Sequence, residues 1–292
     1  MIATALRDPY QSLEDPQTGE RFALKMLKTE TARDREELGY LKHEVEVAKD
    51  LNHPNLVRVY ELDTKTPAPF LVLELCPGFN LKQVLREGPD PIAHLADKII
   101  NQAAHGLHYL NEKGWVHCDV KPDNFLVDDN GNVKLIDFSI AQRSKRSLLS
   151  FLGIKQAVKG TRSYMSPEQI RGETLDCRSD VYSLGCVLFE LLTGRPPYTG
   201  STPNELLERH LRSSVPSAIV YNKNVSHDCA DLIKKMMGKK RETRPKSMWD
   251  VLQAFRDIQI FNKKPQPPKL KLSEMQLGPV TDADSLKQLP QR

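Results

Sequence analysis

The chain lacks several features that would point to a membrane-bound or disulfide-linked protein. Its 292 residues contain no run of about 18 apolar residues, the length that a transmembrane helix needs. Five cysteines form no Cys-x-x-Cys pair and leave an odd count, which favours reduced thiols over a disulfide framework. The first residues show no signal-peptide pattern, and no internal repeat is visible. From these absences we expect a cytoplasmic protein without a membrane segment.

The composition is that of a globular protein with a sizeable core. Hydrophobic residues make up 39% of the chain and charged residues 27%, enough for one large domain or two lobes. The formal net charge is +4, and part of it belongs to the lysine-rich C-terminal segment. So mild an excess, partly confined to one end, leads us to expect no nucleic-acid binding.

The hydrophobic pattern changes character along the chain, from short alternating segments to long helical ones. Alternation predicts strands, and apolar residues three and four apart predict a helix. The first part reads as three strands and one helix, over residues 21–27, 56–60 and 70–75 and over 32–51. After Cys76-Pro77-Gly78, helices are predicted over residues 93–112, 179–193, 203–213, 227–238 and 247–260, with Ser179 as an N-cap. From Lys263 the periodicity ends, which predicts a flexible tail over residues 263–292.

The stretch from His117 to Asn124 is the most informative one. It reads His-Cys-Asp-Val-Lys-Pro-Asp-Asn, and Asp137-Phe138-Ser139 follows it. Between them, two apolar runs flank the turn at 128–132, a pattern that predicts a β-hairpin. The hairpin would hold Asn124 at the start of one strand and Asp137 after the next, where their oxygens can share a hard cation such as Mg²⁺.

These residues resemble the motifs of a known family. The first stretch resembles the catalytic loop of eukaryotic-type protein kinases, usually His-Arg-Asp-Leu-Lys-Pro-x-Asn, and the second resembles their Asp-Phe-Gly metal motif. Asp137 lies 18 residues after Asp119, the family's usual interval. The chain therefore resembles the eukaryotic-type (Hanks-type) serine/threonine protein kinases. The segments 164–169 and 192–198 look like those of bacterial members.

The resemblance implies an α+β, two-lobed protein kinase-like fold. Residues 1–75 would form a small β-rich N-lobe without its first strand, residues 76–262 a larger helical C-lobe, and residues 263–292 the tail. The implied function is a serine/threonine protein kinase that moves the γ-phosphoryl group of ATP to protein substrates with the help of Mg²⁺.

The resemblance also assigns roles to single residues of this chain. Asp119 would be the catalytic base, and Lys121 would stabilise the transferring phosphate. Lys25, in the strand Phe-Ala-Leu-Lys, would bind the α- and β-phosphates of ATP and pair with Glu44, which precedes Pro54 by ten residues as the family's helix glutamate does. Asn124 and Asp137 would be the metal ligands.

Further residues are implied in adenine binding or in the framework of the site. Backbone groups of Glu74 and Cys76 would meet adenine, between the apolar side chains of Ala23 and Leu126. The framework would consist of a Glu168–Arg244 ion pair, Asp180 bracing the catalytic loop backbone, and His117 and Phe138 in an apolar spine. The segment from Thr161 to Glu168 would form the protein-substrate platform, and Thr161 is a serine/threonine signature.

The chain departs from the family in three places. No Gly-x-Gly-x-x-Gly loop precedes Lys25, and Gly19 is the only glycine upstream of it, so either the start is misplaced or the protein works without the loop. Cys118 replaces the arginine that pairs with an activating phosphate, which predicts activity without that phosphorylation. Ser139 replaces the glycine of the metal motif. Two alternatives follow: a pseudokinase that acts as a binding or scaffold protein, and a small-molecule kinase of related fold.

Overall fold

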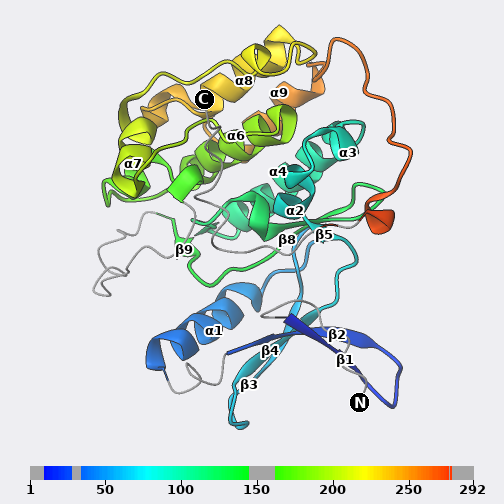
Figure 1. Cartoon of the computed structure of the whole chain (residues 1–292). Helices are drawn as coiled ribbons and strands as arrows, with labels where there is room; N and C mark the ends of the chain where they lie inside the picture. The colour runs from blue at the N-terminus through cyan, green and yellow to red at the C-terminus, as the bar shows by residue number, and fades with distance from the viewer. Residues whose placement is uncertain (1–9, 28–33, 145–161, 276, 278–292) are drawn as a thin grey trace.

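The computed structural model describes residues 10–27, 34–144, 162–275 and 277. These residues form a small lobe built on a β-sheet and a larger lobe of helices (Figure 1). The predicted α+β, two-lobed fold is confirmed. The lobe boundaries at residues 75 and 262 stay predictions; in the structure the last strand pairing into the small sheet ends at Glu74.

The small lobe is a four-stranded antiparallel sheet, within the described residues, with one helix against it. Its strand order is β1 (Tyr10–Glu14), β2 (Arg21–Met26), β4 (Phe70–Glu74) and β3 (Val59–Asp63). The helix α1 (Arg35–Ala48) is capped by Asp34, whose side chain accepts a hydrogen bond from the Glu36 N–H. Leu41, Val47 and Ala48 bury its inner face. The Glu44 carboxylate is buried on the same helix, so it needs a cationic partner.

The larger lobe packs its helices around α6. Every residue of α6 from Ser179 to Leu192 is buried, as its all-round apolar sequence predicts. The helices are α2 (Leu81–Arg86), α3 (Asp90–Ala93), α4 (Ala96–Glu112), α5 (Pro167–Ile170), α6 (Cys177–Thr193), α7 (Pro203–Arg212), α8 (His227–Met236) and α9 (Met248–Arg256). Single-turn 3₁₀ helices are η1 (Pro122–Asn124), η3 (Arg162–Tyr164), η4 (Ala218–Val220), η5 (Arg241–Thr243) and η6 (Leu272–Glu274).

The predicted N-cap of α6 is wrong. Asp176, not Ser179, accepts the capping hydrogen bond, from the Arg178 N–H. Ser179 lies one turn inside the helix, where its buried hydroxyl donates to Glu168 Oε1 at 2.7 Å. A serine near a helix start therefore satisfies a distant carboxylate here instead of the helix's own end.

Two further small sheets include the strand that follows the segment between the lobes and the two strands of the predicted hairpin. Strands β5 (Phe79–Asn80), β7 (Phe125–Val127) and β8 (Val133–Leu135) form one sheet, and β6 (Trp115–Val116) pairs with β9 (Gln142–Arg143). Gly78 precedes β5 with a φ of +125°, and a Cβ there would lie 2.6 Å from the Val127 carbonyl oxygen. Only glycine fits this approach of the connecting segment to β7.

The lobes are also joined by a direct backbone contact. The strand predicted at residues 56–60 starts only at Val59, because Leu56 and Val57 pair with Leu135 of the larger lobe. The Val57 N–H donates to the Leu135 carbonyl at 2.9 Å, and the Leu135 N–H donates to the Asn55 carbonyl at 2.8 Å. A single bridge to a distant strand therefore takes the place of the start of the strand that the alternation predicts.

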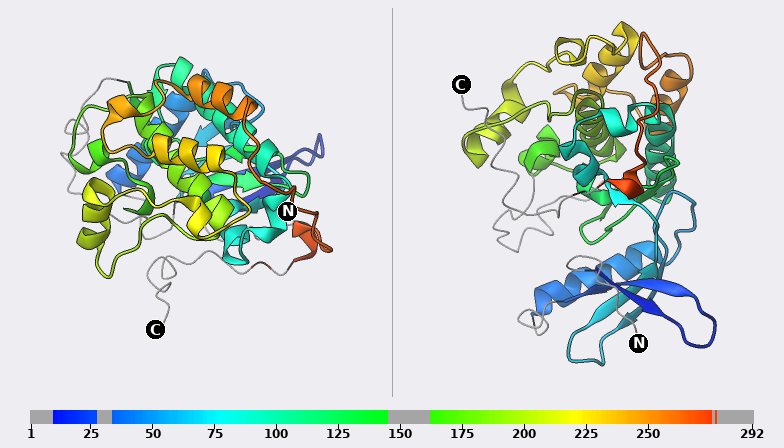
Figure 2. Two further views of the ribbon diagram at one scale, coloured as in Figure 1. Left: turned by 90° about the horizontal axis from the view of Figure 1, so that it is seen from above. Right: turned by 45° about the vertical axis from the view of Figure 1, so that its right-hand side comes forward.

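The C-terminal segment follows the larger lobe back toward the hairpin, as the orange and red ribbon of Figures 1 and 2 shows. Although the sequence predicts a flexible tail here, Leu272 is buried in the main core cluster. Ser273 donates through its hydroxyl and its N–H to the Asp129 carboxylate, at 2.5 and 2.9 Å. Residues 276 and 278–292 lie outside the described part of the chain.

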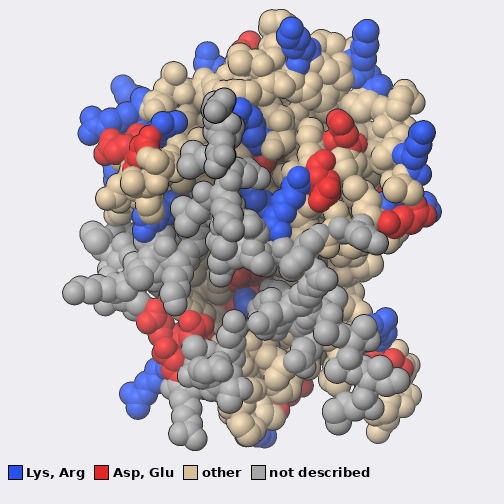
Figure 3. Space-filling model, viewed as in Figure 1, with Lys and Arg blue, Asp and Glu red and all other residues tan. Residues whose placement is uncertain are grey.

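No helix within the described residues is long and apolar enough to cross a membrane. On the face shown in Figure 3, basic and acidic side chains are interspersed over the helical lobe, and several acidic side chains gather at the lower left, over the small lobe. A mixed surface of this kind agrees with the small net charge of +4.

One buried ion pair ties α5 to the loop after α8. Arg244 donates from both terminal nitrogens to the two oxygens of Glu168, at 2.7 and 2.8 Å. The side chains are 0% and 3% exposed. Burial by itself would raise the pKa of Glu168, but the hydrogen bonds and charge of Arg244 and the Ser179 hydroxyl lower it. This stabilisation is therefore present above the usual carboxyl pKa and is lost as the pH falls through the lower folded-state value.

Replacing Arg244 by Met is expected to lower the free energy of unfolding by about 3–5 kcal/mol, because it leaves the Glu168 carboxylate buried without its cation. Arg212→Met is the matched control, since its pair with Glu208 joins side chains that are 81% and 55% exposed. Chemical denaturation at neutral pH compares them. Equal midpoints for the two variants would contradict the importance of the buried pair.

Candidate active site

One ammonium group lies between two carboxylates at the junction of the lobes. Lys25 Nζ on β2 is 2.7 Å from Glu44 Oε2 on α1 and 2.9 Å from Asp137 Oδ1 after β8. Glu44 is 1% exposed, and burial raises the pKa of its carboxyl against the attraction of Lys25. For Asp137 the balance is the reverse: burial would raise its pKa, but the charge of Lys25 and hydrogen bonds from Ser139 and Lys25 lower it. Asp137 is thus held as a carboxylate.

The turn after Asp137 is fixed by hydrogen bonds from two sides. Asp137 itself has a φ of +66°, a left-handed conformation that costs a non-glycine residue about 1 kcal/mol or more. Its Oδ1 accepts from the Ser139 N–H at 3.2 Å, and Glu44 Oε1 accepts from the Phe138 N–H at 3.3 Å. The Phe138 ring contacts His117 edge to face, and both side chains are fully buried.

A second group of polar residues lies on the loop before the hairpin. Lys121 Nζ is 2.8 Å from Asp119 Oδ2. The Asn124 amide donates to the carbonyl of Asp119 at 2.7 Å and to its Oδ2 at 3.0 Å, so it fixes both the backbone and the side chain of that residue. Burial would lower the pKa of Lys121, but Asp119, with Asp123 and Asp137 farther away, raises it. The lysine is therefore a fixed positive charge next to Asp119.

The backbone of this loop is held by a buried carboxylate on α6. Asp180 accepts from the N–H groups of His117 and Cys118, at 2.9 and 3.2 Å, and from the Asn111 amide at 2.9 Å. Cys118 has a φ of +68°. Three donors on one carboxylate stabilise this strained turn, which confirms the predicted bracing by Asp180.

The Cys118 side chain packs among apolar residues, while its N–H donates to the Asp180 carboxylate. It is packed with Val116 and Leu175, and burial raises the pKa of its thiol well above the usual range. Its carbonyl accepts from the Gln169 amide at 2.7 Å. Gln169 was missed by the sequence analysis; no local pattern marks it, because its partner lies 51 residues earlier in the chain.

The residues predicted to enclose adenine lie around the segment that joins the lobes. Ala23 is paired with Leu73 across β2 and β4, and Leu126 lies on β7 opposite Asn80. Within the described residues, neither the N–H nor the carbonyl of Cys76 makes a hydrogen bond to another backbone group. Burial and the nearby Glu74 raise the pKa of the Cys76 thiol to about 12.

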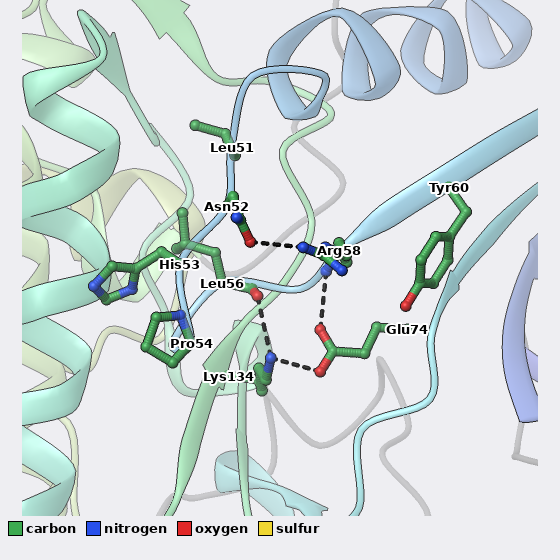
Figure 4. A pocket seen from close by; sticks show the side chains of 9 residues that line it. All are labelled: Leu51, Asn52, His53, Pro54, Leu56, Arg58, Tyr60, Glu74 and Lys134. Atoms are coloured by element: carbon green, nitrogen blue, oxygen red, sulfur yellow. Dashed lines mark hydrogen bonds and ion pairs between the residues drawn. The ribbon is translucent and has the colours of Figure 1, made fainter.

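The Glu74 side chain points away from that site. It faces a pocket of about 360 Å³ between the loop 51–58 and β8, where its carboxylate is 2.5 Å from Lys134 Nζ and accepts from the Arg58 N–H at 3.1 Å (Figure 4). The pocket contains none of the catalytic or metal-binding candidates. The Glu74 N–H is engaged as well, because it donates to the Arg58 carbonyl at 2.9 Å.

The structure thus brings together Lys25, Glu44 and Asp137 in one cluster and Asp119, Lys121 and Asn124 in another. Asn124 and Asp137 offer hard oxygen atoms, which suit Mg²⁺. Within the described residues no group of three or more His, Cys, Asp or Glu side chains could hold a metal by itself. A set of two protein ligands fits Mg²⁺ that completes its shell with phosphate oxygens and water. Thr161, named above, lies outside the described residues.

Comparison with known proteins agrees with these motifs. Residues 11–255 match the family described as protein kinase domain. The chain is 37% identical over 229 residues to the serine/threonine-protein kinase PknB of Mycobacterium leprae, over 76% of this chain and 36% of that protein. It is 35% identical over 254 residues to PknB of Mycobacterium tuberculosis, over 85% of this chain and 40% of that protein.

A more distant match extends the range of relatives. A protein of Streptomyces coelicolor, named as a probable serine/threonine-protein kinase, is 33% identical over 237 residues, 80% of this chain and 35% of that protein. The chain therefore spans well under half the length of the curated relatives it matches.

Asp180→Asn is expected to lower the free energy of unfolding by about 1.5–3 kcal/mol, because the isosteric amide keeps one acceptor oxygen but turns an NH₂ group toward a donor. Asp176→Asn, in the N-cap position of the same helix, is the control; asparagine caps as well as aspartate, so its effect should stay below about 1 kcal/mol. Denaturation curves give both values, and hydrogen exchange at the His117 and Cys118 amides locates the change. Equal losses in the two variants would refute the special role of Asp180.

Proposed function

The chain belongs to the protein kinase family, and on that premise we propose that it is a serine/threonine protein kinase. It transfers the γ-phosphoryl group of ATP to serine or threonine hydroxyls of protein substrates. The proposal is carried by two clusters, Lys25–Glu44–Asp137 and Asp119–Lys121–Asn124. The backbone joins them, because the Ile136 N–H, just before Asp137, donates to the Asn124 carbonyl at 2.9 Å. Phosphoryl transfer needs fixed cations, metal ligands and a base in such an arrangement.

Each cluster has a distinct part in this proposal. Lys25, held in place by Glu44, binds the α- and β-phosphates, and the backbone near Cys76 meets adenine between Ala23 and Leu126. Asp137 and Asn124 would hold Mg²⁺, which neutralises phosphate charge when bound. Glu44 and Asp137 both face Lys25, so the cluster retains negative charge that suits a divalent cation.

Asp119 orients the substrate hydroxyl and accepts its proton. The Asn124 amide supports this role, because it fixes the Asp119 carboxylate at 3.0 Å. Lys121, 2.8 Å from the same carboxylate, presents a positive charge where the transferring phosphate would pass. A lysine at this position and the names of the relatives favour serine and threonine as acceptors over tyrosine.

A binding protein without transfer activity is the second candidate. Ser139, in place of the glycine of the metal motif, favours it. The two clusters, which contain candidates for the phosphate-binding cation, the base and the metal ligands, favour the kinase. The two candidates differ in one measurable respect, because only the kinase moves phosphate.

Asp119→Asn is expected to lower the rate of phosphate transfer by about 10²–10⁴-fold, since it removes the base but keeps the side-chain volume. Transfer from labelled ATP with Mg²⁺, to the protein itself and to a generic basic protein, measures the rate. Asp97→Asn, on the exposed first turn of α4, is the control and should have no effect. ATP binding without transfer in the unaltered protein would support the binding protein instead.

The packing of Cys118 predicts activity without phosphorylation of the segment that follows β9. Because Cys118 cannot pair with a phosphate, the triple variant Ser144→Ala, Ser147→Ala, Ser150→Ala should keep its activity within about twofold. Ser147 and Ser150 lie outside the described residues. Phosphatase treatment before the assay is the companion measurement. A large loss in either experiment would show that a phosphate is required after all.

A further inference from the structure

His43 makes a contact that none of the catalytic motifs explains. It precedes Glu44 on α1, and its Nε2 lies 2.6 Å from the carbonyl oxygen of Ala141, four residues after Asp137. A carbonyl oxygen only accepts, so the ring nitrogen must donate. Ala141 is fully buried. Its carbonyl would lose its partner in an apolar environment if His43 were replaced by a residue without a donor.

The two neighbouring residues of α1 hold both ends of one turn. Glu44 accepts from the Phe138 N–H at 3.3 Å, and His43 donates to the Ala141 carbonyl. The Ala141 N–H donates to the Phe138 carbonyl at 3.1 Å and closes the turn between them. Successive helix residues point about 100° apart. His43 and Glu44 therefore hold the turn by hydrogen bonds from two directions, and these bonds oppose a rotation of α1.

The His43 ring is also fixed by its surroundings. It contacts Trp115 edge to face, with ring centroids 5.9 Å apart. The Arg143 guanidinium lies 4.0 Å from the centroid of the Trp115 ring and donates to the Lys113 carbonyl at 3.0 Å. Trp115 lies on β6, which leads into the catalytic loop, and Arg143 lies on β9, which pairs with it. His43 thus joins α1 both to the Asp137 turn and to the strand before Asp119.

We propose that His43 is a positioning residue that holds α1 in the arrangement with the Lys25–Glu44 pair formed, in a protein whose Cys118 provides no charged partner for a phosphate. The hydrogen bond from Nε2 links α1 directly to the turn after Asp137. A phosphate would make such a link only through charged side chains that bind it. This inference rests on the proposed kinase function for its consequence in catalysis. Its structural part, the hydrogen bonding of α1 to the turn 138–141, can be tested without that function.

Three substitutions separate the hydrogen bond from the packing. His43→Phe keeps an aromatic ring against Trp115 but lacks the donor. His43→Gln has an amide nitrogen at a reach similar to Nε2, and His43→Asn has one that is too short. Two measurements are made on the full chain: hydrogen exchange of the peptides that cover 35–48 and 136–144 without ATP, and steady-state phosphate transfer after phosphatase treatment.

The expected result is faster exchange of both peptides in the Phe and Asn variants, with protection restored in the Gln variant. In transfer, the Phe variant should lose about tenfold in kcat with little change in the KM of the protein substrate, because fewer molecules have α1 in place. Equal behaviour of the Phe and Gln variants, or unchanged exchange in the Phe variant, would overturn the proposal. If the unaltered protein transfers no phosphate, the proposed function fails and the exchange measurement alone decides about His43.

Discussion

The sharing of one ammonium group by two carboxylates is the interaction on which the arrangement of the two lobes depends. Lys25 belongs to the small sheet, Glu44 to its helix, and Asp137 to the larger lobe. Nearly complete burial makes an unpaired Glu44 costly, so α1 cannot leave Lys25 without a large penalty. Because two carboxylates face one ammonium, an excess of negative charge is built into the junction of the lobes. That excess attracts a cation and repels phosphate groups, so phosphate groups should enter together with a cation.

Near this cluster, the loop that carries Asp119 is held by two buried side chains, the Asp180 carboxylate and the Gln169 amide. Asp180 and Gln169 together bind two backbone N–H groups and one carbonyl of the 117–118 turn. The left-handed conformation of Cys118 costs about 1–3 kcal/mol by itself, and these hydrogen bonds offset that cost. The loop geometry therefore depends on contacts from α5 and α6.

The sequence predicted the type of fold and most element positions, because apolar periodicity reports which face of an element is buried. It failed where long-range contacts decide. Leu56 and Val57 alternate like a strand but pair with Leu135, and Ser179 resembles a cap but bonds to Glu168. The segment after Lys263 has no periodicity, yet Leu272 and Ser273 anchor it through two isolated contacts that no pattern reveals.

For the site, the family motifs located the charged residues but not the groups that orient them. Asp119, Asn124 and Asp137 were predicted because their order and spacing resemble those of the family's motifs. Gln169 and His43 bind backbone carbonyls 51 and 98 residues away in the chain. Because every residue has a backbone carbonyl, the sequence carries no mark of the one that is bound. Only the folded structure shows which carbonyl a given side chain reaches.

The thiol of Cys76, in the segment that joins the lobes, has a consequence for inhibitor chemistry. A cysteine in this segment would invite the design of compounds that carry an electrophile. A pKa of about 12 leaves the thiolate, the form that attacks electrophiles, at a very small fraction near neutral pH. An electrophile directed at Cys76 is therefore expected to react slowly near neutral pH.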